Sequence, residues 1–430
     1  MKNVITISLF IFLYLNILAQ SKKEEINMLI LSQKYSEALN LSNELVSNYP
    51  DSAYYHYQKS IINKLMYRYP QALNSIQNAL SLNSGNIDYL EEYGVLLAKK
   101  DKEKEAVDIF KDVLKKDPKR IYSGIWLSNY YMKEREYKEA KDILLKLYNN
   151  DSTNSYFARN IGLCNIKLID KVGSIKWLLK ATELDSTDIK AYEYLALVYV
   201  SLEKFDLALE NLNKALLVDP NNKELYVKIG DTHIMRNHNY QAIPVFLKAY
   251  ELDTKDESIA KKIGICYFKI KKNDKAKEYL DRTINLGVND LQVYEYLGYI
   301  HADMNQLDSS NYYFNEALKL IKPDSETIFS LKESIAKNYY TKGDFVKAIN
   351  IYNEMLGMHL TDVYWITYRK NKVIIEIASI YQDKLDNKLK AIEYYEKVVE
   401  PEITINKNYY EYAQSQISKL KEELFFEGKL

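Results

Sequence analysis

A 34-residue period of small residues runs through most of this 430-residue chain. Twelve positions before each member stands another mostly small residue, and four positions after it a large apolar one. Small residues at facing sites let two antiparallel helices approach closely, and large ones fill the space between neighbouring pairs. Because a lone helix pair cannot bury its apolar face, the pattern predicts a stacked array. The series comprises Ala38, Ala72, Ala106, Ala140, Ser174, Ala208, Ala242, Ala276 and Ser310.

The segment Ile189–Asn222 shows the whole pattern in one unit. Tyr192 and Ala196 lie on its expected first helix, Ala208 lies on the second, and Pro220 ends it. Proline stops the second helix and begins the next turn. Only 12 glycines and 7 prolines occur in the chain, which favours long helical stretches over a turn-rich β fold.

The pattern resembles the tetratricopeptide repeat (TPR) family, as Tyr294, Leu297, Gly298, Phe314 and Ala317 of the ninth unit illustrate. The resemblance extends over nearly all of the chain beyond its first twenty residues. It implies an all-α, right-handed superhelical solenoid of antiparallel helix pairs, with about 11 repeats and a C-terminal capping helix.

The period slips after the ninth unit. The tenth begins near Phe329, four residues late, and the eleventh follows a longer expected helix from Val363 to Lys384. Beyond Pro401, apolar residues spaced three and four apart predict an amphipathic cap. We therefore expect repeats 1–9 over 20–322, repeats 10–11 with longer connections over 323–404, and a capping helix over 405–430.

The first nineteen residues predict a secretory signal peptide. Lys2 supplies a positive charge, the run from Val4 to Leu15 is almost entirely apolar, and cleavage is expected near Ala19 or Gln20. The run is short for a membrane span, which needs about 20 apolar residues. We expect export to the periplasm or cell surface of a bacterium and no transmembrane segment afterwards. An uncleaved anchor is the alternative.

The residues that most often carry chemistry show no catalytic spacing. Cys164 and Cys266 occupy equivalent positions three units apart, roughly 30 Å for helices packed ~10 Å apart. A disulfide needs Cα atoms within about 7 Å, so we expect two buried thiols. His233 and His301 stand where other repeats have tyrosine, and we expect them to pack there. No zinc or phosphate-loop motif occurs. We expect no enzyme activity, cofactor or metal, although an active site of scattered residues stays an alternative.

The charges balance, with 59 basic and 59 acidic residues. Nucleic-acid binding needs a basic surface, so we expect no nucleic acid as partner. We expect a protein or peptide partner instead. Composition names neither that partner nor the oligomeric state.

The resemblance also implies where a partner binds. In TPR proteins the first helix of each pair lines a concave groove, through positions 2, 5, 6, 9, 12 and 13 of the repeat. In repeats 4 to 6 these positions give our candidate binding residues, which are Tyr122, Trp126, Asn129, Lys133, Tyr156, Arg159, Asn160, Lys167, Lys190 and Tyr194.

Part of this set resembles the carboxylate clamp of some TPR domains. Asn129, Asn160 and Lys190 match clamp positions, whereas Ile125 and Tyr194 stand where the family has Lys and Arg. The clamp is therefore incomplete, and neighbouring cations of the set would have to supply the charge. Our hypothesis is that this stretch binds an extended peptide with an acidic or carboxylate end. The alternative is an ordinary solvated helix face.

Two functions follow from these expectations. The first is an exported scaffold or adaptor that binds a protein or extended peptide in its concave groove. The second is a carbohydrate-handling or envelope-biogenesis accessory, in which Tyr296, Tyr299 and Tyr340 offer flat aromatic contacts to a sugar. The first is favoured because helical solenoids present long concave surfaces.

Overall fold

The computed structural model describes residues 22–321, 325–358, 363–399, 407–427 and 429, and the signal peptide expected over 1–19 lies outside them. Within these ranges every regular element is an α-helix, which confirms the all-α prediction. The chain divides into two compact units, Met1–Val218 and Asp219–Leu430, and we describe each by itself. None of the described helices is long and apolar enough to span a membrane.

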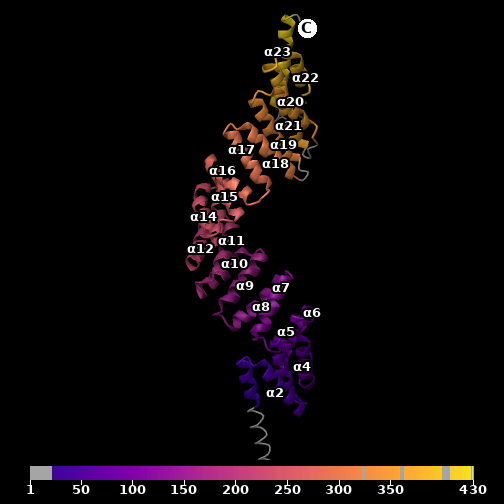
Figure 1. Cartoon of the computed structure of the whole chain (residues 1–430), viewed down its shortest axis with the longest axis vertical. Coiled ribbons are helices and arrows are strands. Elements are labelled where there is room, and N and C mark those ends of the chain that lie inside the picture. Colours follow the sequence, from indigo (N-terminus) through magenta and orange to yellow (C-terminus); the bar gives the residue numbers. More distant parts are fainter. Residues whose placement is uncertain (1–21, 322–324, 359–362, 400–406, 428, 430) are drawn as a thin grey trace, which may run out of the picture. The chain divides into compact units, whose positions relative to one another are not determined.

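Unit 1 is a row of antiparallel helix pairs that begins with a helical segment over residues 22–31 (Figure 1). Odd-numbered helices are the first members of their pairs and even-numbered helices the second. The helices of unit 1 are α2 (Tyr35–Asn48), α3 (Ala53–Leu65), α4 (Tyr69–Leu82), α5 (Ile87–Lys99), α6 (Glu103–Lys116), α7 (Ile121–Lys133), α8 (Tyr137–Asn150), α9 (Ser155–Lys167), α10 (Lys171–Leu184), α11 (Ile189–Val200) and α12 (Phe205–Val218).

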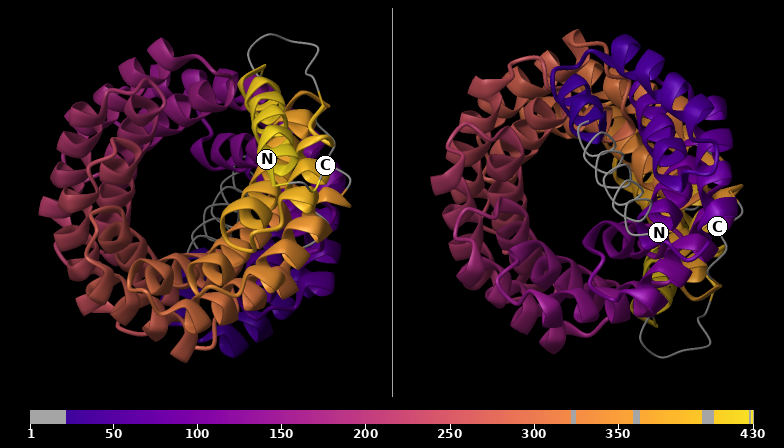
Figure 2. Two further views of the ribbon diagram at one scale, coloured as in Figure 1. Left: turned by 90° about the horizontal axis from the view of Figure 1, so that it is seen from above. Right: turned by 90° about the horizontal axis from the view of Figure 1, so that it is seen from below.

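Unit 2 continues the alternation of first and second helices, and its last helix packs against both members of the final pair. Within each unit the pairs stack in two layers (Figure 2). The helices of unit 2 are α13 (Lys223–Met235), α14 (Asn239–Leu252), α15 (Glu257–Lys269), α16 (Asn273–Asn285), α17 (Leu291–Asp303), α18 (Leu307–Leu320), α19 (Ser325–Thr341), α20 (Phe345–Leu356), α21 (Val363–Asp383), α22 (Lys388–Tyr395) and α23 (Lys407–Phe426).

The paired helices approach closely where the sequence places small residues, as predicted. Gly94 of α5 faces the ring of Phe110 in α6, and a Cβ at this glycine would lie 2.9 Å from the ring atom Cε1. In the preceding pair the Ser60 hydroxyl donates a hydrogen bond of 2.9 Å to the carbonyl of Ala72, and both residues are fully buried. The small residues that recur every 34 positions thus lie where the two helices of each pair make contact.

The turn inside each pair repeats with the same period. After α5, Asp101 adopts a left-handed conformation (φ 58°), and the next amide, of Lys102, donates to the carbonyl of Leu97 at 3.0 Å. This pattern satisfies the last carbonyls of the helix. In the tenth pair Gly343 is the left-handed residue of this turn, and it follows Asn305 by 38 residues instead of 34. The left-handed non-glycine residues of the regular series are Gln33, Tyr67, Asp101, Arg135, Ile169, Glu203, Asn237, Lys271 and Asn305.

The division of the chain into 20–322, 323–404 and 405–430 stays a prediction. The compact units meet at residues 218 and 219, inside the regular series of repeats.

Candidate functional site

The first helices of unit 1 form one continuous surface, which we call the first-helix face. Helix α3 contacts α5, and α9 contacts α11, although each of these two helices belongs to a different pair. Polar contacts also join consecutive first helices, so the face is held together by its own side chains. These contacts are Lys64 to Glu92 (2.5 Å), Ser123 to Glu91 (2.6 Å) and Tyr156 to Asn129 (3.4 Å).

The ten candidate binding residues all lie on three neighbouring first helices. Tyr122, Asn129, Lys133, Lys167 and Lys190 are exposed, Asn160 is buried, and the others are half-buried. Their role in binding stays a prediction. Helix α7 carries Tyr122, Trp126, Asn129 and Lys133, α9 carries Tyr156, Arg159, Asn160 and Lys167, and α11 carries Lys190 and Tyr194.

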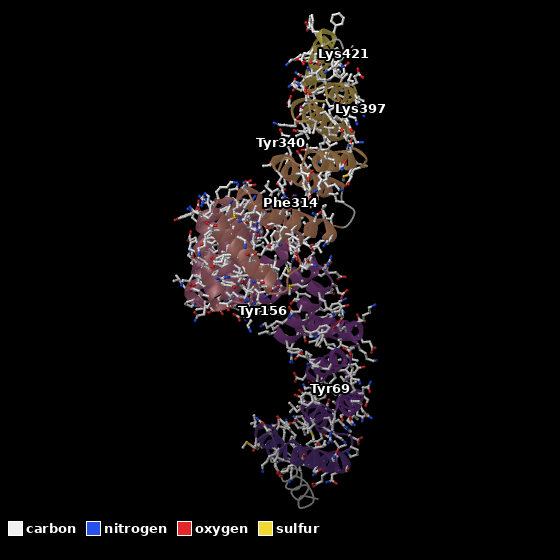
Figure 3. All side chains as sticks on the ribbon, turned by 45° about the horizontal axis from the view of Figure 1, so that its top comes forward. Tyr69, Tyr156, Phe314, Tyr340, Lys397 and Lys421 are labelled. Atoms are coloured by element: carbon white, nitrogen blue, oxygen red, sulfur yellow. The ribbon has the colours of Figure 1, made fainter. Side chains whose placement is uncertain are left out.

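Arg159, the half-buried cation of the predicted clamp, is bound inside the protein. Its Nη1 lies 3.0 and 3.1 Å from the two carboxylate oxygens of Asp188, whose side chain is only 4% exposed. Asp188 also caps α11 by accepting a hydrogen bond from the amide of Ala191. The guanidinium lies 5.2 Å from the ring centre of Tyr156, a residue labelled in Figure 3. Arg159 therefore ties α9 to the start of α11.

Two of the three candidate lysines also have carboxylate partners in the chain. Lys133 pairs with Glu103 at 2.8 Å, and Lys190 pairs with Glu193 at 2.6 Å. Among the described residues, Lys167 has neither an ion pair nor a hydrogen bond through its ammonium group. A carboxylate arriving from a partner would therefore compete with acidic groups of the protein for most of the clamp's charge.

The buried candidate Asn160 is also engaged, because its amide nitrogen donates to the Tyr156 carbonyl at 2.7 Å. The aromatic candidates pack partly against rings of their own and of the preceding repeat. Trp126 lies 4.6 Å from the Phe110 ring and stacks on Tyr130, while Tyr122 keeps half of its surface exposed. Of the ten residues, Tyr122, Asn129 and Lys167 are the most available to a ligand.

The tyrosines suggested for sugar binding also pack within unit 2. Tyr296 contacts Phe268 edge-on at 5.1 Å, and Tyr299 contacts Phe314 in the same way at the same distance. Tyr340, labelled with Phe314 in Figure 3, packs against Phe345. Since sugar stacking needs an open aromatic face, these contacts disfavour the carbohydrate alternative.

The first-helix face also contains a cavity that the sequence reasoning missed. It has a volume of about 340 Å³ and lies among α3, α5 and α7. We call it the acidic pocket, because three carboxylates and one lysine line it. Its lining residues are Tyr57, Lys64, Asp88, Glu91, Glu92, Val95 and Tyr122.

Two of the three carboxylates share one cation, Arg120, which precedes α7. Its Nη1 lies 2.7 Å from Asp88 Oδ1 and 3.4 Å from Glu91 Oε2. Glu91 also accepts a hydrogen bond from the hydroxyl of Ser123. Asp88 and Glu91 are therefore satisfied by groups of the protein.

Glu92 is different, because it is only 7% exposed and only one of its oxygens is bonded. Oε2 pairs with Lys64, while Oε1 has no hydrogen-bond partner among the described residues. Burial raises the pKa of Glu92, and Lys64 partly opposes the change. Burial and the charges of Glu92 and Asp88 raise the pKa of the neighbouring Tyr57 to about 12. The pocket therefore carries uncompensated negative charge.

A comparison of repeat positions would have revealed this pocket. Glu91 and Arg159 are two periods apart, and so are their partners Arg120 and Asp188. The two pairs thus occupy equivalent sites with their charges exchanged. The sequence reasoning applied the groove positions to repeats 4 to 6, but not to the third repeat, where Glu91 and Glu92 lie.

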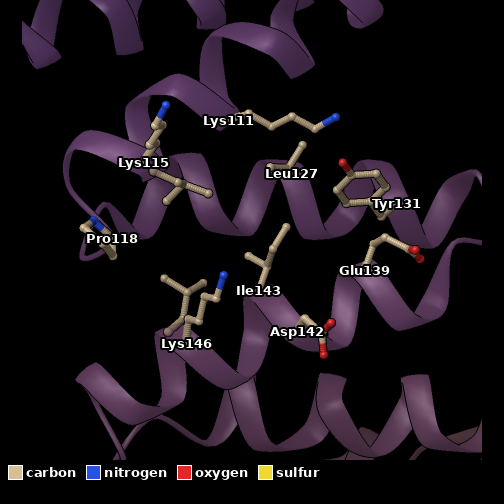
Figure 4. Close-up of a pocket in the computed structure, with 11 residues that line it drawn as sticks. Lys111, Lys115, Pro118, Leu127, Tyr131, Glu139, Asp142, Ile143 and Lys146 are labelled. Carbon is tan, nitrogen blue, oxygen red and sulfur yellow. The ribbon is translucent and has the colours of Figure 1, made fainter.

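A second cavity, of about 700 Å³, lies among α6, α7 and α8 (Figure 4). Three lysines and two carboxylates line it, with Leu127 and Ile143 lying between them in the view. None of its polar side-chain atoms is both buried and unpartnered in the described structure. It therefore shows, among its described residues, no unmet polar group that would select a ligand. The labelled charged residues are Lys111, Lys115, Lys146, Glu139 and Asp142.

The cysteines and His301 are structural, as predicted. Both thiols are free and buried, and burial raises the pKa of Cys164 to about 11 and that of Cys266 to about 12. His301 is buried, stacks on Tyr313 and has its Nδ1 2.6 Å from Gln306 Oε1. His233 is half-buried in its helix. No cluster of His, Cys, Asp and Glu able to hold a metal ion occurs in the described ranges.

Family comparisons agree with the helix-pair geometry. Two tetratricopeptide repeat models match the chain, one over residues 189–222 and 372–400 and the other over 262–286. A TPR repeat-containing protein of Methanocaldococcus jannaschii is 25% identical over 244 residues, which cover 52% of this chain and 42% of that protein. DnaJ homolog subfamily C member 7 of Mus musculus is 29% identical over 163 residues, which cover 34% of this chain and 33% of that protein. The chain thus spans less than half the length of either relative.

Solved structures that match part of the chain include the MamA protein and a tetratricopeptide repeat protein from Parabacteroides merdae. MamA is 26% identical, with a TM-score of 0.38, and the match covers 40% of this chain and 94% of MamA. The Parabacteroides protein is 17% identical, with a TM-score of 0.42, and the match covers 58% of this chain and 98% of that one.

Proposed function

The chain belongs to the tetratricopeptide-repeat family, and from that premise we propose that it is an exported scaffold that binds an extended segment of a partner protein along its first-helix face. Repeats of this family typically mediate protein–protein interaction. The export part of the proposal rests on the sequence pattern of residues 1–19.

The observation that supports this proposal is the combination of a rigid face with exposed apolar groups. Contacts between consecutive first helices hold the face in place before any partner arrives. On it Tyr122 is 51% exposed and Leu197 is 56% exposed. A preordered surface loses little conformational entropy on binding, and partly exposed apolar side chains gain most from being covered.

Site-specific photo-crosslinking in the intact cell tests this proposal. A benzophenone amino acid is placed at Asn129 or Leu197 on the first-helix face, and at Leu217 on α12 as the control. Leu217 is 83% exposed but belongs to a second helix. We expect Asn129 and Leu197 to crosslink to one partner, at two sites within a single segment of its sequence.

The control position decides between this face and the rest of the surface. Crosslinks from Leu217 to the same partner, with none from Asn129 or Leu197, would place binding on the second helices and contradict the proposal. Fractionation of the same cells tests export, for which the chain is expected in the envelope or outside the cell rather than in the cytoplasm.

A further inference from the structure

The acidic pocket has one negative charge more than its own cations balance. Asp88, Glu91 and Glu92 line it, while Lys64 and the adjacent Arg120 are the cations that pair with them. Three carboxylates thus face two cations, and one of these, Arg120, also pairs with Asp117 outside the pocket at 3.2 Å. Close charges of one sign in a partly buried site repel each other more strongly than in water, so a further cation would be attracted here.

The unpartnered oxygen of Glu92 shows which kind of group is missing. A buried acceptor that has lost its water and gained no donor costs free energy, here for a group that carries charge. Glu92 lines the pocket, and its Oε1 is that acceptor. The last torsion of a glutamate is broad, so a modest rotation turns this oxygen toward an incoming donor. The missing group is therefore a hydrogen-bond donor with positive charge.

The walls of the pocket suit a flat cation. Tyr57 of α3 and Tyr122 of α7 both line the cavity, on either side of α5 in the chain order of first helices. Each ring also contacts a ring of the protein, Tyr57 that of Tyr89 at 4.8 Å and Tyr122 that of Phe110 at 6.2 Å, so a cation would use the remaining side of each ring. Guanidinium groups stack on aromatic faces and donate several hydrogen bonds in one plane. An ammonium group offers the charge without the planar fit.

We propose that the acidic pocket binds the guanidinium of an arginine side chain in the partner's segment. This inference rests on the proposed function, because it names the partner chemistry that the first-helix face selects. The guanidinium donates to Glu92 Oε1 and lies against Tyr57 and Tyr122, while Lys64 keeps its bond to Oε2.

Peptide titration against the full chain tests the assignment. The probes are two acetylated, amidated pentapeptides, Ser-Ala-Arg-Ala-Ser and the same peptide with citrulline, a neutral isostere, in place of arginine. We expect the arginine peptide to bind about tenfold more tightly, as one charge-assisted hydrogen bond gives. Ligand-observed NMR measures both dissociation constants.

Variants locate the site of binding. Glu92→Gln removes the charge while keeping the shape, and we expect it to weaken the arginine peptide by about tenfold. Asp88→Asn, at the more exposed edge of the pocket, serves as a second variant. The matched control is Glu105→Gln, an exposed glutamate on α6 of the same helix pair. It should change the affinity by less than about twofold, because a distant exposed charge is screened.

Any of three results would overturn the assignment. Equal affinities for the arginine and citrulline peptides, or the absence of binding by both, would show that the pocket does not select a guanidinium. Weakening by Glu105→Gln as large as that by Glu92→Gln would show general charge attraction. Crosslinking from Leu197 tests the proposed function independently, so a scaffold that fails these titrations is distinguishable from one that binds nothing.

Discussion

The acidic pocket and the predicted carboxylate clamp lie on the same first-helix face, but their charges are balanced differently. In the clamp, Arg159 is held by the almost fully buried Asp188. In the acidic pocket, one oxygen of Glu92 has no partner in the described structure. The clamp therefore presents less positive charge to a ligand than its lysines and arginine suggest. The pocket, in contrast, presents negative charge that the protein does not balance.

The two regions differ because Glu91 and Arg159 each pair with the residue that precedes the next first helix. Glu91 with Arg120 and Arg159 with Asp188 are the same inter-repeat pair with opposite polarity. In the third repeat the adjacent Glu92 adds a further carboxylate, which Lys64 only half satisfies. The charge that a groove position presents thus depends on its neighbour in the next repeat.

The largest expected effect follows from removing Arg159. We predict that Arg159→Met lowers the free energy of unfolding by about 3 kcal/mol, because it leaves the buried carboxylate of Asp188 without its cation. Urea denaturation followed by circular dichroism measures the change. The control is the double variant Arg159→Met with Asp188→Asn, which keeps a capping side chain and should recover much of the loss. A single variant as stable as the original protein would mean that Arg159 is free to bind a ligand.

Gly94→Ala tests the packing around Phe110, which contacts both the candidate binding residues and the acidic pocket. Phe110 contacts Trp126, one of the ten candidate binding residues, and Tyr122 of the acidic pocket, and a Cβ on Gly94 would collide with its ring. We predict a loss of about 2 kcal/mol in the free energy of unfolding, the usual cost of overpacking a core. Gly85→Ala is the control, since no atom lies within 4 Å of the added methyl group. Equal stability of the two variants would contradict the close packing.

Lys64→Met should reveal the buried charge of Glu92. We predict a loss of about 1.5 kcal/mol at neutral pH, because Glu92 then lacks both partners. The folded-state pKa of Glu92 already lies above its unfolded value, and losing Lys64 raises it further. Such a group stabilises the fold below the unfolded pKa, and this contribution is lost as pH rises through the folded pKa. The loss measured by urea denaturation should therefore shrink on acidification, and a pH-independent loss would rule out this cause.

The smallest effect is expected at the exposed clamp cation Lys133. Its pair with Glu103 lies at the surface, so Lys133→Ala should change the free energy of unfolding by less than about 0.5 kcal/mol. The same variant should leave the affinity for the arginine peptide unchanged. A marked loss of affinity would show that the arginine peptide binds near Lys133 and outside the acidic pocket.

The sequence predicted features that repeat every 34 residues, because backbone packing determines them. The close approach at Gly94 and the free, buried state of Cys164 and Cys266 are examples. Side-chain partners were harder to predict. Arg159 appeared available for a ligand, because no local rule says that Asp188, 29 residues away, binds it. The left-handed conformation of Ile169 was also unexpected, since β-branched residues disfavour it and the position of the turn alone imposes it.

The central claim is that the first-helix face selects a cation rather than a carboxylate. Its most direct test compares the affinity of the full chain for two pentapeptides that differ only in a central arginine or glutamate. The account predicts that the arginine peptide binds at least about tenfold more tightly, and that Glu92→Gln largely removes the preference. Tighter binding of the glutamate peptide, which the clamp hypothesis predicts, would contradict the account.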